Sequence, residues 1–228
     1  MAYLLAIETS TEICSVALGK DATCVALIEN TQGNTHAEKI LVFIDQILQQ
    51  ANIPTTKIDA VCVSAGPGSY TGLRIGVSSA KGLCDALDIP LIAVSTLQSM
   101  AWGAKTQYPD YNYYCPMIDA RRMEVYSAVY DADMQTIQEV TNVVLYENTY
   151  SDFLKKDKLV FSGNALTKLQ TVLSDNPNAV FAETKTSARY LLALAYEQYI
   201  NRNFADTAYF EPFYLKEFHA VLPKTKRL

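Results

Sequence analysis

Hydrophobic residues follow two different spacings along the first half of the chain. Between short apolar runs, residues 35–51 and 73–87 repeat apolar side chains every three or four positions, as one face of a helix does. Ser95 or Thr96 is placed to cap a short third helix. The short runs themselves are typical of buried strands and lie at residues 3–7, 14–18, 23–28, 58–64 and 91–94.

A similar order of elements begins again after the proline-containing stretch at 108–116, which indicates a connection between two lobes. A helix is predicted before the last strand of this second half, and another helix follows it at 187–201. The strands are predicted at residues 113–118, 124–130, 137–145, 159–162 and 180–181.

The repetition predicts an α/β fold made of two related lobes. At an offset of 111 residues, Ile7-Glu8 aligns with Ile118-Asp119, so an acidic residue ends the first strand of each half. We expect an N-terminal lobe at 1–107, and at 108–228 a smaller C-terminal lobe together with a C-terminal tail. Both lobes should have mixed sheets and the duplicated, RNase H-like architecture of actin and the sugar kinases (the ASKHA fold). The alternative is one α/β domain with a small domain appended to it.

The composition is that of a folded, acidic protein. Of the 228 residues, 50% are hydrophobic and 19% are charged, and the formal net charge is −5. A surface of that sign repels phosphate, so we do not expect this chain alone to bind RNA tightly. No uncharged apolar stretch is long enough to cross a membrane. The five cysteines form no C-x-x-C pair, which favours reduced core thiols and a cytoplasmic protein.

Five of the nine glycines lie in one segment, residues 64–83. The first three follow a strand and precede a helix, where backbone N–H groups can bind an anion, but their spacing matches neither the dinucleotide fingerprint nor the P-loop. Gly76 and Gly82 lie within the predicted helix, where each costs about 1 kcal/mol relative to alanine. Together with Gly72 and Ser79 they form a face of small residues, which allows another helix to approach closely.

Several blocks of sequence resemble one known family. They are LAIETST (5–11), CSVAL (14–18), HAE (36–38), GPGSYTGLRIG (66–76), AKGL (80–83), DARRMEVYSAVY (119–130) and EPFYL (211–215). Taken together and in this order, the blocks resemble the motifs of the TsaB family, also called YeaZ. The resemblance extends from residue 5 to residue 215 and therefore covers nearly the whole chain.

The resemblance implies a fold of the actin and sugar-kinase type and a role in a bacterial complex. That complex places threonylcarbamoyl on the adenosine next to the transfer RNA anticodon. Its catalytic paralogue, TsaD, transfers the group from threonylcarbamoyl-adenylate, and the TsaB subunit binds TsaD and helps to recruit the ATPase TsaE. We therefore expect a non-catalytic scaffold or activating subunit that pairs with itself in isolation and meets transfer RNA only through the complex.

The resemblance also allows a comparison with the metal site of the catalytic paralogue, an H-x-x-x-H pair on the first helix. The corresponding segment here is HAEKI (36–40), with Ile40 in place of the second histidine. A pair at this spacing puts two imidazoles on one helix face, which one histidine cannot do. The only other histidine is His219. We expect no metal site, and we place His36 at the helix start or on the surface.

Four residues remain as candidates for binding a cofactor. Glu8 and Asp119 stand at the strand ends where actin-type ATPases hold magnesium and water. Arg121 and Arg122 follow Asp119 after a single alanine and are an alternative set of partners for these acids. The second half has a single glycine, Gly163, which argues against a nucleotide site in this chain alone.

Binding of ATP or ADP at an interface with another subunit is a further possibility. The rival functions are an autonomous actin-type ATPase and a metallopeptidase-like hydrolase. For neither rival do we predict a catalytic residue.

A partner surface is predicted on the two helices of the first lobe. In helix 35–51 the inward stripe includes Ile40 and Leu41, which leaves Val42 and Phe43 outside it. Two helices from each of two related lobes would then form a four-helix contact, either with TsaD or with a second copy. The alternative is that Phe43 is covered internally and the glycines serve internal packing. The predicted partner residues are His36, Lys39, Val42, Phe43, Gln46, Gly72, Gly76, Ser79 and Gly82.

Overall fold

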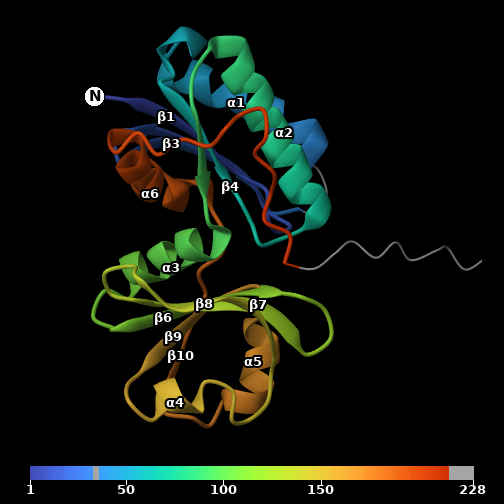
Figure 1. The fold of residues 1–228 in the computed structure, drawn as a ribbon, viewed down its shortest axis with the longest axis vertical. Helices are drawn as coiled ribbons and strands as arrows, with labels where there is room; N and C mark the ends of the chain where they lie inside the picture. The colour runs from blue at the N-terminus through green and yellow to red at the C-terminus, as the bar shows by residue number, and fades with distance from the viewer. Residues whose placement is uncertain (33–35, 216–228) are drawn as a thin grey trace, which may run out of the picture.

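The computed structural model describes residues 1–32 and 36–215 and has two lobes, each built on a five-stranded mixed sheet (Figure 1). His219 lies outside the described residues, as does Thr35, the first residue of the predicted helix 35–51. In the part of the chain that is described, each helix is too short or too polar to cross a membrane.

The sheet of the first lobe has the strand order β3-β2-β1-β4-β5. Strand β1 pairs antiparallel with β2 and parallel with β4, so a hairpin and a crossover meet at the central strand. Helices α1 (His36–Ala51) and α2 (Tyr70–Leu87) cover one face of the sheet, and the short 3-10 turn η1 (Thr55–Lys57) follows α1. The strands are β1 (Tyr3–Glu8), β2 (Cys14–Lys20), β3 (Thr23–Asn30), β4 (Ala60–Ser64) and β5 (Leu91–Val94).

The sheet of the second lobe repeats this arrangement. Its order, β10-β9-β6-β7-β8, places the five strands as in the first sheet, with a hairpin on one side of β6 and parallel strands on the other. This correspondence confirms the doubled lobe. Helices α4 (Ser151–Leu154) and α5 (Leu166–Leu173) lie on one face of the sheet. The strands are β6 (Tyr113–Asp119), β7 (Glu124–Asp131), β8 (Thr136–Val144), β9 (Leu159–Gly163) and β10 (Ala179–Ala182).

The two remaining helices cross between the lobes. Helix α3 (Thr96–Gln107) follows the first sheet in sequence, but its Leu97 and Met100 are buried against the second sheet. Helix α6 (Ala188–Ile200) follows the second sheet, but its Leu191 and Leu192 are buried against the first. Both helices lie between the sheets in Figure 1. A boundary at 107/108 therefore separates the two sheets but not the two hydrophobic cores.

The structure places most elements within a few residues of their predicted positions and differs mainly at α2. This helix begins at Tyr70 rather than at residue 73, because the Ser69 side chain accepts a hydrogen bond from the backbone N–H of Gly72 at 3.2 Å and caps it. The cap of α3 is Ser95, whose side chain accepts from the backbone N–H of Gln98 at 3.4 Å. Helix α4 and the turn η1 were not predicted, because both are too short for a periodic pattern.

Candidate functional site

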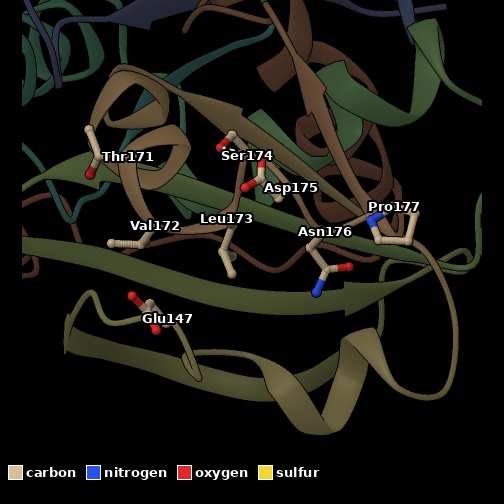
Figure 2. Close-up of a pocket in the computed structure, with 8 residues that line it drawn as sticks. All are labelled: Glu147, Thr171, Val172, Leu173, Ser174, Asp175, Asn176 and Pro177. Carbon is tan, nitrogen blue, oxygen red and sulfur yellow. Dashed lines mark hydrogen bonds between the residues drawn. The ribbon is translucent and has the colours of Figure 1, made fainter.

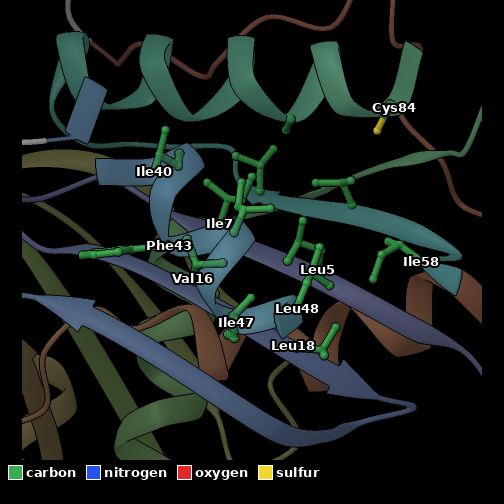
Figure 3. Close-up of a cluster of buried hydrophobic side chains, with 14 of the residues drawn as sticks. Leu5, Ile7, Val16, Leu18, Ile40, Phe43, Ile47, Leu48, Ile58 and Cys84 are labelled. Atoms are coloured by element: carbon green, nitrogen blue, oxygen red, sulfur yellow. The ribbon is translucent and has the colours of Figure 1, made fainter. Parts of the chain in front are cut away.

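Helix α1 presents a different face to solvent from the predicted one. Phe43, expected outside the inward stripe, is only 7% exposed, whereas Leu41, expected inside it, is 60% exposed. Figure 3 shows Phe43 within the buried cluster that α1 forms with β1 and β2, together with Val16 and Ile47. Leu41 and Phe43 flank Ile40 and Ile44 on opposite sides, so helical spacing alone does not decide which of them is buried. The prediction that Phe43 is exposed was wrong.

The exposed apolar pair on α1 therefore consists of Leu41 and Val42. The side chain of Val42 is 48% exposed. Lys39 and Gln46 are also exposed on this helix, as predicted. His36 does begin the helix, but it is buried rather than on the surface, and its Nε2 lies 2.9 Å from the carbonyl oxygen of Thr11. Of the predicted α1 residues, Lys39, Val42 and Gln46 are thus accessible to a partner.

The small face of α2 is partly buried and partly exposed. A Cβ atom on Gly72 would lie 2.1 Å from the carbonyl oxygen of Thr9, and one on Gly76 would lie 2.2 Å from the Thr9 hydroxyl oxygen. These two glycines are buried, and they let α2 approach the loop after β1, which is the internal packing named as the alternative. Gly82 faces open space, and Ser79 is half-buried. The outer part of the face therefore begins at Ser79.

A groove runs between α1 and α2 on the outside of the first lobe. It encloses about 340 Å³. Its lining residues are Ala37, Ile40, Leu41, Arg74, Ile75, Ser78 and Ser79. We refer to this groove together with Val42 as the α1–α2 face. The prediction from sequence missed Arg74, Ile75 and Ser78, because it placed the exposed side of α2 at Gly72 and Gly76.

The glycine-rich turn before α2 is packed against its own chain. A Cβ atom on Gly68 would lie 2.5 Å from the carbonyl oxygen of Ser10, and the backbone N–H of Ser69 donates to that same oxygen at 2.6 Å. On the other side, the backbone N–H of Phe213 donates to the carbonyl oxygen of Ala65 at 2.7 Å. The glycines thus allow close approach of backbone to backbone, and the N–H of Ser69 is already used.

Glu8 ends β1 inside the protein. Its side chain is fully buried, and Oε1 accepts hydrogen bonds from the backbone N–H of Ser10 at 2.6 Å and from the Ser64 hydroxyl at 3.0 Å. Within residues 1–32 and 36–215, Oε2 has no hydrogen-bond partner. Burial raises the pKa of the Glu8 carboxyl above its ordinary value of 4.5, and the hydrogen bonds from Ser10 and Ser64 oppose this shift.

Asp119, the equivalent acid of the second lobe, lies on the surface with a different set of partners. Its Oδ1 is 2.6 Å from Nζ of Lys168 and accepts the backbone N–H of Arg121 at 2.7 Å. Within the described residues, neither the Arg121 nor the Arg122 side chain forms an ion pair with Glu8 or Asp119, so the alternative that they pair with these acids does not hold. Both arginines have positive φ angles, 72° and 47°, and are exposed at the turn between β6 and β7.

The side chains that could bind a metal ion are not clustered in the described residues. Among the described residues, no group of three or more His, Cys, Asp or Glu is arranged to hold a metal ion. A second hollow, of about 440 Å³, lies at the end of α5, far from the α1–α2 face (Figures 1 and 2). Glu147 and Asp175 line it. Their carboxylates would repel a nucleotide or RNA phosphate.

Replacing Glu8 with glutamine tests the effect of its burial. Because the folded protein disfavours the ionised carboxylate, wild-type stability falls relative to Glu8→Gln as pH rises above the ordinary pKa of 4.5. Below that pH both folded and unfolded Glu8 are protonated and the difference is constant. We expect urea unfolding from about pH 4 to about pH 8 to show the gap widening in favour of Glu8→Gln. A gap that does not change with pH would contradict the burial of this carboxyl.

Comparisons with known proteins agree with this architecture. The family model described as "tRNA N6-adenosine threonylcarbamoyltransferase" (TsaD) matches residues 28–222. The tRNA threonylcarbamoyladenosine biosynthesis protein TsaB of Escherichia coli is 42% identical over 144 residues, which is 62% of each chain. The protein of that name from Haemophilus influenzae is 31% identical over 230 residues, or 93% of each chain.

A solved structure extends the agreement to three dimensions. It is a Pseudomonas aeruginosa protein described as similar to peptidase YeaZ, and it is 27% identical to this chain. The two superpose with a TM-score of 0.84 over 95% of this chain and 100% of that one. The fold is therefore the two-lobed ASKHA fold, with a mixed sheet in each lobe. From the 31% sequence identity over 93% of its length and from this fold, the chain belongs to the TsaB (YeaZ) family.

Proposed function

We propose that this protein acts in the biosynthesis of threonylcarbamoyladenosine in transfer RNA, as a non-catalytic subunit that binds a TsaD-type catalytic paralogue. The observation that carries this proposal is the exposed Leu41–Val42 pair beside the groove between α1 and α2. Two large apolar side chains, adjacent in sequence and exposed next to a groove, form a surface that is stabilised by covering it.

The match to the TsaD family model supports a partner with a related lobe. A related lobe would present its own pair of helices, so that two helices from each protein pack as a four-helix contact. Arg74 in the lining of the groove supplies a positive charge that can select an acidic rim on the partner. In the absence of the paralogue, a second copy of this chain is the proposed occupant of the same face.

The chemistry of the complex is assigned to the other subunits. Among the described residues, the burial of Glu8 and the internal packing of the glycine-rich turn support this assignment. ATP or ADP would instead lie at a joint between subunits, with the exposed Arg121 and Arg122 as candidate contacts. A TsaE-type ATPase would be recruited by the assembled pair, and the net charge of −5 restricts transfer RNA contact to the complex in the cytoplasm.

Co-purification from a strain carrying the tagged chain and an untagged TsaD-type paralogue tests this proposal. We expect a stoichiometric complex on size-exclusion chromatography and no appreciable ATP hydrolysis by the isolated chain. If the chain fails to bind the paralogue, the partner role is wrong. If the isolated chain hydrolyses ATP or peptides and loses that activity on Asp119→Ala, one of the rival enzyme functions replaces it.

A further inference from the structure

The loop after β1, residues Thr9, Ser10 and Thr11, contacts three elements that are distant in sequence. Toward α2, the Thr9 hydroxyl donates to the carbonyl oxygen of Gly72 at 2.8 Å, and the carbonyl oxygen of Ser10 accepts from the N–H of Ser69 at 2.6 Å. All three loop residues are buried. The loop thus fixes the first turns of α2, because buried hydrogen bonds hold both partners in one geometry.

The same loop fixes the start of α1. Nε2 of His36 lies 2.9 Å from the carbonyl oxygen of Thr11. Since a carbonyl oxygen only accepts, Nε2 carries the proton and donates it. His36 is the first residue of α1 and is buried. One loop therefore sets the N-terminal ends of both helices that form the α1–α2 face.

The third contact crosses to the segment that returns from the second lobe. The hydroxyl groups of Thr11 and Thr186 lie 2.6 Å apart, and both side chains are buried. Thr186 stands between β10 of the second sheet and α6, which packs on the first sheet. Two residues later, the backbone N–H of Ala188 donates to the Ser15 hydroxyl at 2.9 Å. Thr11 therefore meets the chain at the joint between the lobes.

We propose that the Thr9–Thr11 loop couples the α1–α2 face to the joint between the lobes, so that Thr11, His36 and Thr186 are positioning residues for partner binding. This inference rests on the proposed function for the identity of the partner. Residues of both α1 and α2 line the groove, so its shape depends on the spacing of these helices, and the loop contacts the start of each. A shift at Thr186 is transmitted through Thr11 to His36. Because coupling between two sites is reciprocal, a partner on the face also stabilises the joint.

The chain offers a matched pair of substitutions to test the coupling. Thr186→Val removes the hydroxyl that bonds to Thr11, whereas Thr184→Val removes a buried hydroxyl that has no hydrogen-bond partner among the described residues. Both threonines lie in the same segment, and neither belongs to the α1–α2 face. We expect Thr186→Val to bind the paralogue, or a second copy, about fivefold more weakly, and Thr184→Val to bind as the wild type does.

A double-mutant cycle separates coupling from simple loss of stability. Both Thr11→Val and Thr186→Val remove the hydrogen bond between the two hydroxyls, and Thr11→Val also removes the one that Thr11 accepts from the backbone N–H of Ile13 at 3.3 Å. The double variant should therefore bind no more weakly than Thr11→Val alone. His36→Ala should weaken binding, and His36→Gln should restore part of it, because the glutamine amide supplies a donor near the position of Nε2. Each variant is first shown to be folded by its thermal transition. Equal affinities for Thr186→Val and the wild type, or equal losses for Thr186→Val and Thr184→Val, would overturn the proposal.

Amide hydrogen exchange tests the coupling without a partner. In the isolated chain, Thr186→Val but not Thr184→Val should speed exchange in the first turns of α1 and α2, because the restraint passes through Thr11. If the wild type binds neither the paralogue nor a second copy, the proposed function fails, and this exchange measurement decides the coupling. Unchanged exchange at both helix starts in Thr186→Val would then overturn it.

Discussion

Replacing Leu41 with glutamate is expected to abolish partner binding and leave the fold intact. Leu41 is 60% exposed and lines the α1–α2 groove, so a carboxylate there stays solvated in the free protein but is buried in a complex. Burying an unpaired charge costs several kcal/mol, which corresponds to a loss of affinity of about 100-fold or more. Isothermal titration with the paralogue and sedimentation of the isolated chain measure the loss, and thermal unfolding verifies the fold.

Two further substitutions make this prediction specific. Ile137→Glu changes a residue of similar exposure, 49%, on strand β8 of the second lobe and should leave partner binding unchanged. Phe43→Glu puts a charge into the core cluster of the first lobe and should unfold that lobe rather than report on the face. If Leu41→Glu binds as tightly as Ile137→Glu does, the partner surface lies elsewhere.

Alanine at two glycines of α2 is expected to change stability in opposite directions. At Gly76 the new methyl would lie 2.2 Å from the Thr9 hydroxyl oxygen, which must move and give up its hydrogen bond to Gly72. Overpacking and the lost hydrogen bond together should lower the free energy of unfolding by about 2 kcal/mol or more. At Gly82 nothing lies within 4 Å of the new methyl. There the higher helix propensity of alanine should raise stability by about 1 kcal/mol or less.

Urea unfolding of the two variants measures both effects. Because each substitution has the same composition change in the same helix, the difference between them isolates the contact with Thr9. Destabilisation of similar size at both glycines would contradict the internal packing of Gly76. The more severe Gly76→Leu should prevent folding of the first lobe, so it is unsuited to testing the interface.

The order of the elements could be predicted from sequence because it depends on local spacing. Ile7-Glu8 and Ile118-Asp119 end equivalent strands, and the strand orders of the two sheets match. The burial of Phe43 instead of Leu41 could not be predicted, since both flank the same apolar stripe. Which of the two is buried depends on which side of the helix faces the sheet. Local pattern sets which residues form a helix, while packing sets which flank of that helix faces inward.

The candidate site shows the same division. The exposure of Val42, Lys39 and Gln46 was correctly predicted on α1. The role of Gly76 depends on Thr9, which is 67 residues earlier in the sequence, and no local pattern connects the two. The pairing of Asp119 with Lys168 is likewise a contact between distant segments. Residue type alone, as for Arg121, does not predict which residues a side chain contacts.

Helices α3 and α6 each pack on the sheet of the other lobe, and this has a consequence during synthesis of the chain. The face of the first sheet that carries Leu4, Ala6 and Val94 is covered by α6, which begins only at Ala188. During synthesis the five strands and two outer helices of the first lobe emerge long before that cover is available. Exposed apolar sheet faces aggregate or recruit chaperones. The nascent first lobe therefore keeps an uncovered apolar face, to which other chains or chaperones can bind, until α6 has left the ribosome.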